Sequence, residues 1–270
     1  MLNGKYKVID SHCHVYPDHI AERAVTGVDT RYEMHSVHTG ELSDLLRVMD
    51  EEGIDHSVIC YCATYYKYLK MTNDQTAENV RIGGGRVSGL GSLHQDSPDI
   101  RADVRYIKSL GLKGVKLHPD MQDFVLDSPK GMEMLSAIRE AGMPVLIHTG
   151  DYRYDYSNPD RVEHILQEFP DMTIIGGHFA GYTLWLEASR RLHKYPNLYV
   201  DCSSTAFGVT DSDYRECIEL YGTDRVLFGT DYPMWPAKEE FRRLLGLGFS
   251  ESDYTKIFSE NAKKVFDLSI

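Results

Sequence analysis

The 270-residue sequence has no long apolar run, no cluster of basic residues and no regular framework of cysteines. No apolar stretch approaches the roughly 18 residues of a membrane-spanning helix, and the opening MLNGKYKVIDSH lacks the pattern of a signal peptide. The net charge of −12 is not offset by any basic patch. We therefore expect neither nucleic acid nor a membrane surface as a partner.

Cysteine is scarce and irregularly spaced. The five cysteines are Cys13, Cys60, Cys62, Cys202 and Cys217. An odd set without framework spacing predicts free thiols and a cytoplasmic location. Cys60 and Cys62 resemble half of a metal site, but they lie inside the apolar run SVICYCA and have no second pair. Buried structural thiols are the better interpretation.

The remaining sequence alternates short apolar segments with longer amphipathic stretches. The apolar segments are 7–15, 57–63, 87–93, 114–118, 144–148, 173–178, 198–202 and 226–230. Each is bounded by Gly, Pro, Asp or Ser, which is typical of buried strands. Stretches such as SPKGMEMLSAIREAG begin with a capping residue and end in Gly, as helices do. Eight such units predict a parallel sheet closed into a (β/α)₈ TIM barrel, with residues 1–270 forming a single domain.

Two histidines end the first apolar segment. Residues two apart in a strand point to the same face, so His12 and His14 project together while Cys13 points away. Two imidazoles on one strand can bind a borderline metal such as zinc. Taken alone, this pattern is weak, because most such pairs are packing or surface histidines.

Three other apolar segments also end in residues that can bind a metal. His148, His178 and Asp231 follow the fifth, sixth and eighth segments. A single such histidine would be explained as a buried group with a polar partner. A barrel gathers the ends of its strands around one axis, so these residues are expected to meet His12 and His14. The pattern predicts a metal site at the carboxyl ends of the strands.

The motifs VIDSHCHV, GVKLHP, PVLIHTG, IIGGHFAG and LFGTDYP resemble those of the amidohydrolase superfamily. More narrowly, they are similar to the amidohydrolase-2 branch, which contains aminocarboxymuconate-semialdehyde decarboxylase and related hydrolases. The resemblance extends over nearly the whole chain. It implies one divalent metal, zinc or alternatively manganese, held by His12, His14, His148 and Asp231. It also implies catalytic roles for His178, as a polarising or acid/base group, and for Asp231, as the base.

The fourth segment departs from the pattern of binuclear relatives, which place a carboxylated lysine or a glutamate there. If Val115 and Leu117 face the helices, Lys116 and His118 face the barrel interior. These two residues could hold a second metal, bind substrate anions, or, for Lys116, pair with an acid such as Asp231. A single metal is favoured.

Further substrate-binding candidates lie in the loops. Arg153 and Tyr154 follow the fifth segment, and Trp235 follows the eighth. Arg153 could clamp a carboxylate, or it could simply pack on aromatic rings. Trp235 could line the mouth of the barrel or cap its end.

The expected activity is hydrolysis of an ester, lactone or amide bond in a small molecule by a metal-activated water. The alternative is metal-dependent, non-oxidative decarboxylation of a small carboxylic acid, which uses the same residues. Decarboxylases of this branch tend to be longer, with insertions that shape a dimeric site, so the length of this chain favours hydrolysis. A third hypothesis is a non-catalytic barrel that binds a ligand. A homodimer remains open.

Overall fold

The computed structural model describes residues 4–270 and contains an eight-stranded parallel sheet whose strands follow one another in chain order. The strands are β1 (Ile9–His14), β2 (His56–Cys60), β3 (Val87–Ser92), β4 (Gly114–Leu117), β5 (Val145–Ile147), β6 (Ile174–Gly176), β7 (Leu198–Asp201) and β8 (Val226–Leu227). Each overlaps one of the eight apolar segments of the sequence. Chain order of this kind is what short, right-handed β-α-β connections produce.

The sheet curls until its first strand meets the chain that leaves its last strand. Ser11 N donates a hydrogen bond to Phe228 O at 2.9 Å, and Asp231 N donates to His12 O at 2.9 Å. A parallel bridge also joins Cys13 to Tyr232. These contacts close the sheet at the seam between β8 and β1. The predicted single-domain (β/α)₈ TIM barrel is therefore confirmed.

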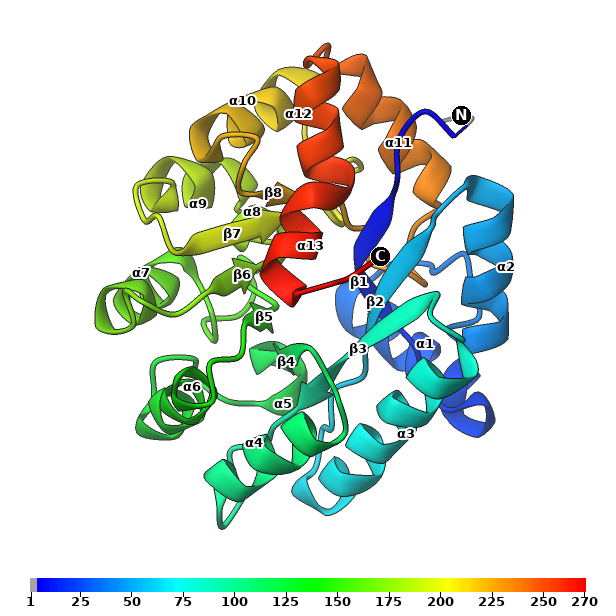
Figure 1. Cartoon of the computed structure of the whole chain (residues 1–270). Helices are drawn as coiled ribbons and strands as arrows, with labels where there is room; N and C mark the ends of the chain where they lie inside the picture. Colours follow the sequence, from blue (N-terminus) through cyan, green and yellow to red (C-terminus); the bar gives the residue numbers. More distant parts are fainter. Residues whose placement is uncertain (1–3) are drawn as a thin grey trace.

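Helices surround the strands as an outer ring (Figure 1). The helices of the chain, in the ring and at the ends of the barrel, are α1 (Asp18–Tyr32), α2 (Leu42–Glu52), α3 (Leu69–Ile82), α4 (Ile100–Ser109), α5 (Pro119–Gln122), α6 (Pro129–Glu140), α7 (Pro159–Glu168), α8 (Gly177–Ala180), α9 (Trp185–Leu192), α10 (Asp211–Tyr221), α11 (Ala237–Gly246), α12 (Glu251–Thr255) and α13 (Asn261–Phe266), with the 3₁₀ helix η1 (Tyr66–Tyr68) and the π-helix η2 (Lys256–Glu260). Among residues 4–270, no helix combines the length and the apolar character needed to cross a membrane.

Capping signals in the sequence mark several helix starts correctly. The Ser128 side chain accepts a hydrogen bond from Gly131 N at the start of α6, and Asp99 caps α4 in the same way. Asn158 stands at the equivalent position of α7, but its side chain makes no capping bond. The position alone therefore identifies the start of α7, where Pro159 occupies the first turn.

Alternating residues of each strand serve two different cores. On β4, Val115 and Leu117 belong to the core between strands and helices, whereas Lys116 is fully buried on the inner side. Inside the barrel, one apolar cluster includes Val58, Leu90 and the C-terminal Phe266. The predicted inward orientation of Lys116 follows from this alternation and is confirmed.

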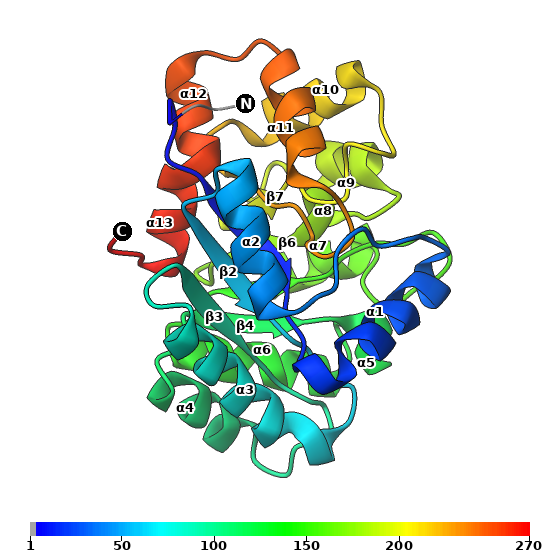
Figure 2. The ribbon, with the colours of Figure 1, turned by 90° about the vertical axis from the view of Figure 1, so that its right-hand side faces the viewer.

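The two ends of the barrel are closed differently. Helix α13 lies at one end, and helices α1 and α5 lie at the opposite end (Figure 2). The second end is the one to which the strands point with their carboxyl termini. The connection between β1 and α2 therefore places α1 beside the expected active site, and residues 33–41 follow it without helical structure.

Phe266 anchors α13 to the apolar interior of the barrel, and its side chain is 1% exposed. We expect Phe266→Ala to lower the free energy of unfolding by about 3–5 kcal/mol, because the cavity left in this tightly packed interior cannot be filled. Urea unfolding measures the change. Lys264→Ala, on the exposed face of the same helix, is the control and should cost less than about 1 kcal/mol.

Candidate functional site

The first strand and the loop after the last strand bring three predicted ligands together. His14 Nε2 lies 3.2 Å from Asp231 Oδ1, and His12 Nε2 lies 3.6 Å from the same oxygen. All three residues are buried. Asp231 adopts a left-handed backbone conformation with φ 61°, which is unusual for a residue other than glycine. Such strain persists only where surrounding contacts fix it, and it is frequent at functional sites.

The orientation of His12 is set by partners on both sides of its ring. Its Nδ1 lies 2.9 Å from Asp201 Oδ2, and its Nε2 lies 2.7 Å from Lys116 Nζ. An ammonium group has no acceptor, so His12 accepts from Lys116 through Nε2 and donates to Asp201 through Nδ1. Asp201 therefore selects the tautomer in which the Nε2 lone pair points into the cluster.

Asp201 is a functional residue that the sequence reading missed. Burial raises the pKa of its carboxyl group, but the His12 ring, which donates a hydrogen bond to it, and the hydrogen bond from Ser203 outweigh this and hold the pKa below its usual range. Asp201 also accepts from His178 N at 3.0 Å and from Ser203 N at 3.1 Å. The signal was present, because Asp201 ends an apolar strand just as the predicted ligands do.

His178 and His148 extend the cluster to the neighbouring strands. His178 Nε2 lies 3.1 Å from His148 Nδ1. His178, Phe179 and Ala180 have successive φ values of 58°, 54° and 62°, so the chain makes a left-handed turn directly after β6. Burial lowers the pKa of His178 to about 3. This turn directs the His178 ring back over the strand ends and against His148.

A tyrosine and an aspartate outside the strands hold the other side of His148. Asp120 Oδ2 lies 3.3 Å from His148 Nε2, and Tyr32 OH donates to Asp120 Oδ2 at 3.2 Å. Burial, together with the charge of Asp120, raises the pKa of Tyr32. His118 stacks on the His148 ring with centroids 4.1 Å apart. No sequence pattern marked Tyr32 or Asp120, since they belong to α1 and α5 and meet His148 only in the folded chain.

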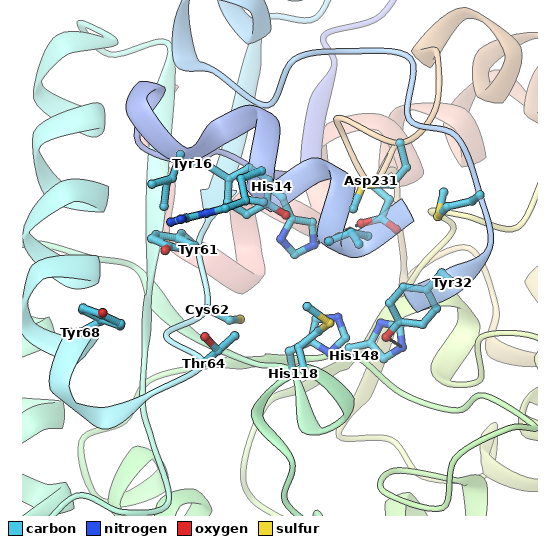
Figure 3. A pocket seen from close by; sticks show the side chains of 18 of the residues that line it. His14, Tyr16, Tyr32, Tyr61, Cys62, Thr64, Tyr68, His118, His148 and Asp231 are labelled. Atoms are coloured by element: carbon cyan, nitrogen blue, oxygen red, sulfur yellow. Dashed lines mark hydrogen bonds and ion pairs between the residues drawn. The ribbon is translucent and has the colours of Figure 1, made fainter. Parts of the chain in front are cut away.

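The cluster opens into a cavity of about 680 Å³. His14, His118, His148 and Asp231 line its inner end. Six tyrosines and four methionines contribute to its walls, so most of the cavity surface is aromatic or apolar. Figure 3 shows His118, His148 and Asp231 grouped near Tyr32, whereas Tyr61 and Tyr68 lie toward the other end. A cavity of this size and character suits a small organic molecule.

The predicted substrate-binding residues are placed unevenly. His118 lines the cavity, whereas Lys116, Arg153, Tyr154 and Trp235 are not among its lining residues. Arg153 forms an ion pair of 2.8 Å with the buried Asp151, and its guanidinium lies 5.5 Å from the centre of the Tyr154 ring. Trp235 Nε1 donates to Ser204 Oγ at 2.8 Å. The substrate-binding roles of these four residues stay predictions.

The residues present fit a divalent cation. The Nε2 atoms of His14 and His12 lie 3.2 and 3.6 Å from one oxygen of Asp231, close to the ~3.4 Å that separates two tetrahedral ligands each about 2.1 Å from a metal. Asp201 keeps the proton of His12 on Nδ1, so its Nε2 is an unprotonated nitrogen of the kind that ligates a metal. Within residues 4–270, two triplets of potential ligand atoms lie within 4.8 Å of one another, namely His12, His14 and Cys60, and His12, His178 and Asp201.

A TIM barrel whose strand ends carry histidines and an aspartate around one axis defines a class of barrel enzymes in which a metal assists the reaction. Within that class, the chain belongs to the amidohydrolase family, whose model matches residues 9–268. The resemblance expected from the five sequence motifs is confirmed. The chain is thus an enzyme of the amidohydrolase superfamily.

Individual relatives are distant but cover most of the chain. Gamma-resorcylate decarboxylase of Polaromonas sp. (strain JS666) is 24% identical over 282 residues, covering 83% of this chain and 86% of the relative. The crystal structure of the uncharacterized TIM-barrel protein Bb4693 of Bordetella bronchiseptica has a TM-score of 0.80 at 22% identity, covering 97% and 99% of the two chains. That of 5-carboxyvanillate decarboxylase of Novosphingobium aromaticivorans, complexed with manganese and 4-hydroxy-3-methoxy-5-nitrobenzoic acid, has a TM-score of 0.78 at 18% identity, covering 99% and 98%.

Substitution of Asp201, the hydrogen-bond partner of His12, tests the site directly. We expect Asp201→Asn to weaken binding of Mn²⁺ or Zn²⁺ by about 10–100-fold, because His12 loses the carboxylate that orients it. Isothermal titration calorimetry with the metal ion measures the change in dissociation constant. Asp224→Asn, a surface substitution that disturbs only the ion pair with Lys256, should leave metal affinity unchanged. Equal metal affinity in Asp201→Asn and the unaltered protein would contradict the orienting role.

Proposed function

We propose that the protein is a metal-dependent, non-oxidative decarboxylase of a small aromatic or unsaturated carboxylic acid. The observation that carries this proposal is the position of the imidazole and carboxylate groups at the inner end of a cavity whose walls are mostly aromatic and apolar. A flat apolar acid can place its carboxylate among the imidazoles while its carbon framework contacts tyrosine and methionine side chains. The similarity to gamma-resorcylate decarboxylase supports the same reaction.

The proposed ligands of one divalent ion are His12, His14, His148 and Asp231. Either manganese or zinc suits a set of imidazoles with one carboxylate. When bound, such an ion supplies charge that orients a carboxylate and stabilises negative charge developing on the substrate. His118 stacks directly on His148 and is one of the residues that face the substrate.

The reaction also requires a proton donor. Loss of carbon dioxide breaks the bond between the carboxylate carbon and the carbon framework, and the bonding pair remains on the framework carbon until a proton replaces the carboxylate. We assign transfer of this proton to Asp231, which lines the cavity and, as a carboxylate, takes the proton from water before passing it to the framework carbon. Ser204 Oγ donates to Asp231 Oδ2 at 2.6 Å and fixes the orientation of the carboxyl group. His178 Nε2 lies 3.1 Å from Nδ1 of His148, which lines the cavity. Through this contact we assign His178 the polarising or acid/base role.

Hydrolysis, the activity favoured by chain length alone, would employ the same side chains with Asp231 as the base. The length argument is weak, because the alignment with gamma-resorcylate decarboxylase covers 86% of that protein. The present chain therefore aligns with most of the length of a decarboxylase, and its own length does not argue against that activity. The relatives support decarboxylation over hydrolysis of an ester, lactone or amide.

The cysteines support a reducing environment. All five are buried as free thiols, and none forms a disulfide among the residues that the structure describes. Proteins of oxidising compartments more often pair their cysteines. We propose a cytoplasmic location on this basis.

Purified protein loaded with Mn²⁺ or Zn²⁺ provides the test of function. We expect carbon dioxide release from gamma-resorcylate, 5-carboxyvanillate or a related hydroxylated benzoate, and loss of that release when a chelator removes the metal. A panel of esters, lactones and amides should remain intact. Turnover of that panel without carbon dioxide release from any acid would reject decarboxylation in favour of hydrolysis.

Substitution of His178 tests whether this residue serves catalysis or metal binding. We expect His178→Asn to retain the metal and to lower kcat by about 100-fold or more, the usual effect of removing an acid/base group. Elemental analysis and carbon dioxide release measure the two quantities on the same preparation. His164→Asn, an exposed histidine on α7, is the matched control and should change neither. A variant that lost metal and activity together would show that His178 is needed to hold the metal site.

A further inference from the structure

The cavity continues well beyond the imidazole cluster. Tyr61, Tyr65 and Tyr68 also line it, with the Tyr65 and Tyr68 rings 6.4 Å apart, and we call this part the far compartment; Arg23 from α1 lines the cavity too and acts on Tyr61. Figure 3 shows Tyr61 and Tyr68 at one end of the cavity and His148 at the other. The volume of about 680 Å³ lies in the upper half of the usual range for ligand sites, roughly 300–1,000 Å³. A substrate with a single ring at the inner end would leave this compartment unfilled.

A continuous aromatic wall connects the two compartments. The rings of His14 and Tyr16 are stacked with centroids 6.4 Å apart, and the Tyr16 ring meets Tyr61 edge-on at 5.5 Å. The far compartment therefore begins two ring spacings from a proposed metal ligand. A planar, conjugated or biaryl framework fits along such a wall, since aromatic groups pack favourably on one another.

Arg23 differs from every other arginine among residues 4–270. It is the one whose guanidinium has neither a carboxylate within 4.0 Å nor a hydrogen bond; Arg225, which also lacks a carboxylate, donates to three backbone carbonyls. Arg23 is also the sole arginine in the cavity lining, which contains no lysine. Its charge is felt inside the cavity, because burial raises the pKa of the Tyr61 hydroxyl and Arg23 opposes that rise.

The alternative cation is already neutralised. Arg153 contacts both carboxylate oxygens of the buried Asp151 and lies outside the cavity lining. A bidentate pair of this kind leaves little positive charge for a ligand. Arg23 thus supplies the permanent positive charge of the cavity lining, close enough to Tyr61 to act on its hydroxyl group.

We infer that Arg23 binds a second carboxylate of the substrate, so that the enzyme acts on dicarboxylic acids with an aromatic or conjugated framework. The inference rests on the proposed function, in which the first carboxylate lies among the imidazoles and is lost as carbon dioxide. The second carboxylate is retained in the product and pairs with the guanidinium, which can donate two parallel hydrogen bonds. Tyrosine rings of the far compartment surround the framework between the two acids.

Binding of matched acids tests this directly and requires no turnover. The probes are biphenyl-4,4′-dicarboxylate and stilbene-4,4′-dicarboxylate, each compared with its monocarboxylate, titrated into Mn²⁺-loaded protein by calorimetry. We expect at least one diacid to bind about 10-fold more tightly than its monoacid, a modest gain because Arg23 is exposed and water screens its charge. The gain should shrink as salt concentration rises.

Substitution of Arg23 should abolish that preference selectively. In Arg23→Met, which keeps much of the side-chain length without the charge, diacid and monoacid should bind equally, with the monoacid affinity unchanged. Arg23→Lys should restore part of the preference, because it keeps the charge but not the paired donors. Arg105→Met removes an exposed arginine on α4 outside the cavity and should behave as the unaltered protein.

Two results would overturn the inference: no diacid preference in the unaltered protein, or a preference that survives in Arg23→Met. Failure of the proposed reaction would look different. A protein that binds diacids through Arg23 but releases no carbon dioxide from any acid would retain this site while losing the decarboxylase assignment. Conversely, rapid decarboxylation of monoacids together with no effect of Arg23→Met on diacid binding would retain the reaction and reject the site.

Discussion

Inside the barrel, Asp201 accepts a hydrogen bond from His12 where neither side chain is exposed. A buried carboxylate is costly unless it is fully paired, and Asp201 meets this condition with donors from β1, from the turn after β6 and from its own loop. The same bond fixes which nitrogen of His12 is free. The position of the His12 lone pair, the contact with Lys116 and the convergence on Asp231 all depend on this pairing.

The barrel and the connections that leave it have separate tasks. Strand ends supply the imidazoles and the carboxylate, which require a rigid frame to face one another at about 3 Å. Helix α1 and the segment around η1 supply the cavity walls, including Tyr32 and Tyr68. Such connections vary without disturbing the barrel, which is how one fold serves different substrates. The reacting groups indicate the kind of chemistry, and the residues of the first connection indicate the shape of the molecule that enters.

Family membership and cavity chemistry constrain the function in complementary ways. The amidohydrolase family match accounts for the cluster at the strand ends, and both hydrolysis and decarboxylation are compatible with it. The aromatic and apolar walls favour a flat organic acid over a water-filled hydrolytic site. The role inferred for Arg23 adds a further restriction, since a guanidinium without a protein partner favours substrates that carry an anionic group beside it.

The sequence determined the barrel and most of its inner cluster, because each strand is a short apolar run and a polar residue directly after such a run must lie at the strand's end. His12, His14, His148, His178 and Asp231 were found in this way, and the seam between β1 and β8 places them around one axis. Asp201 carried the same signal and was overlooked. Only the tertiary structure revealed Tyr32, Asp120 and Arg23, and only it paired Arg153 with Asp151. The physical reason is that these contacts join helices and loops to distant strands, and no local periodicity in the chain records which side chains will meet across such distances.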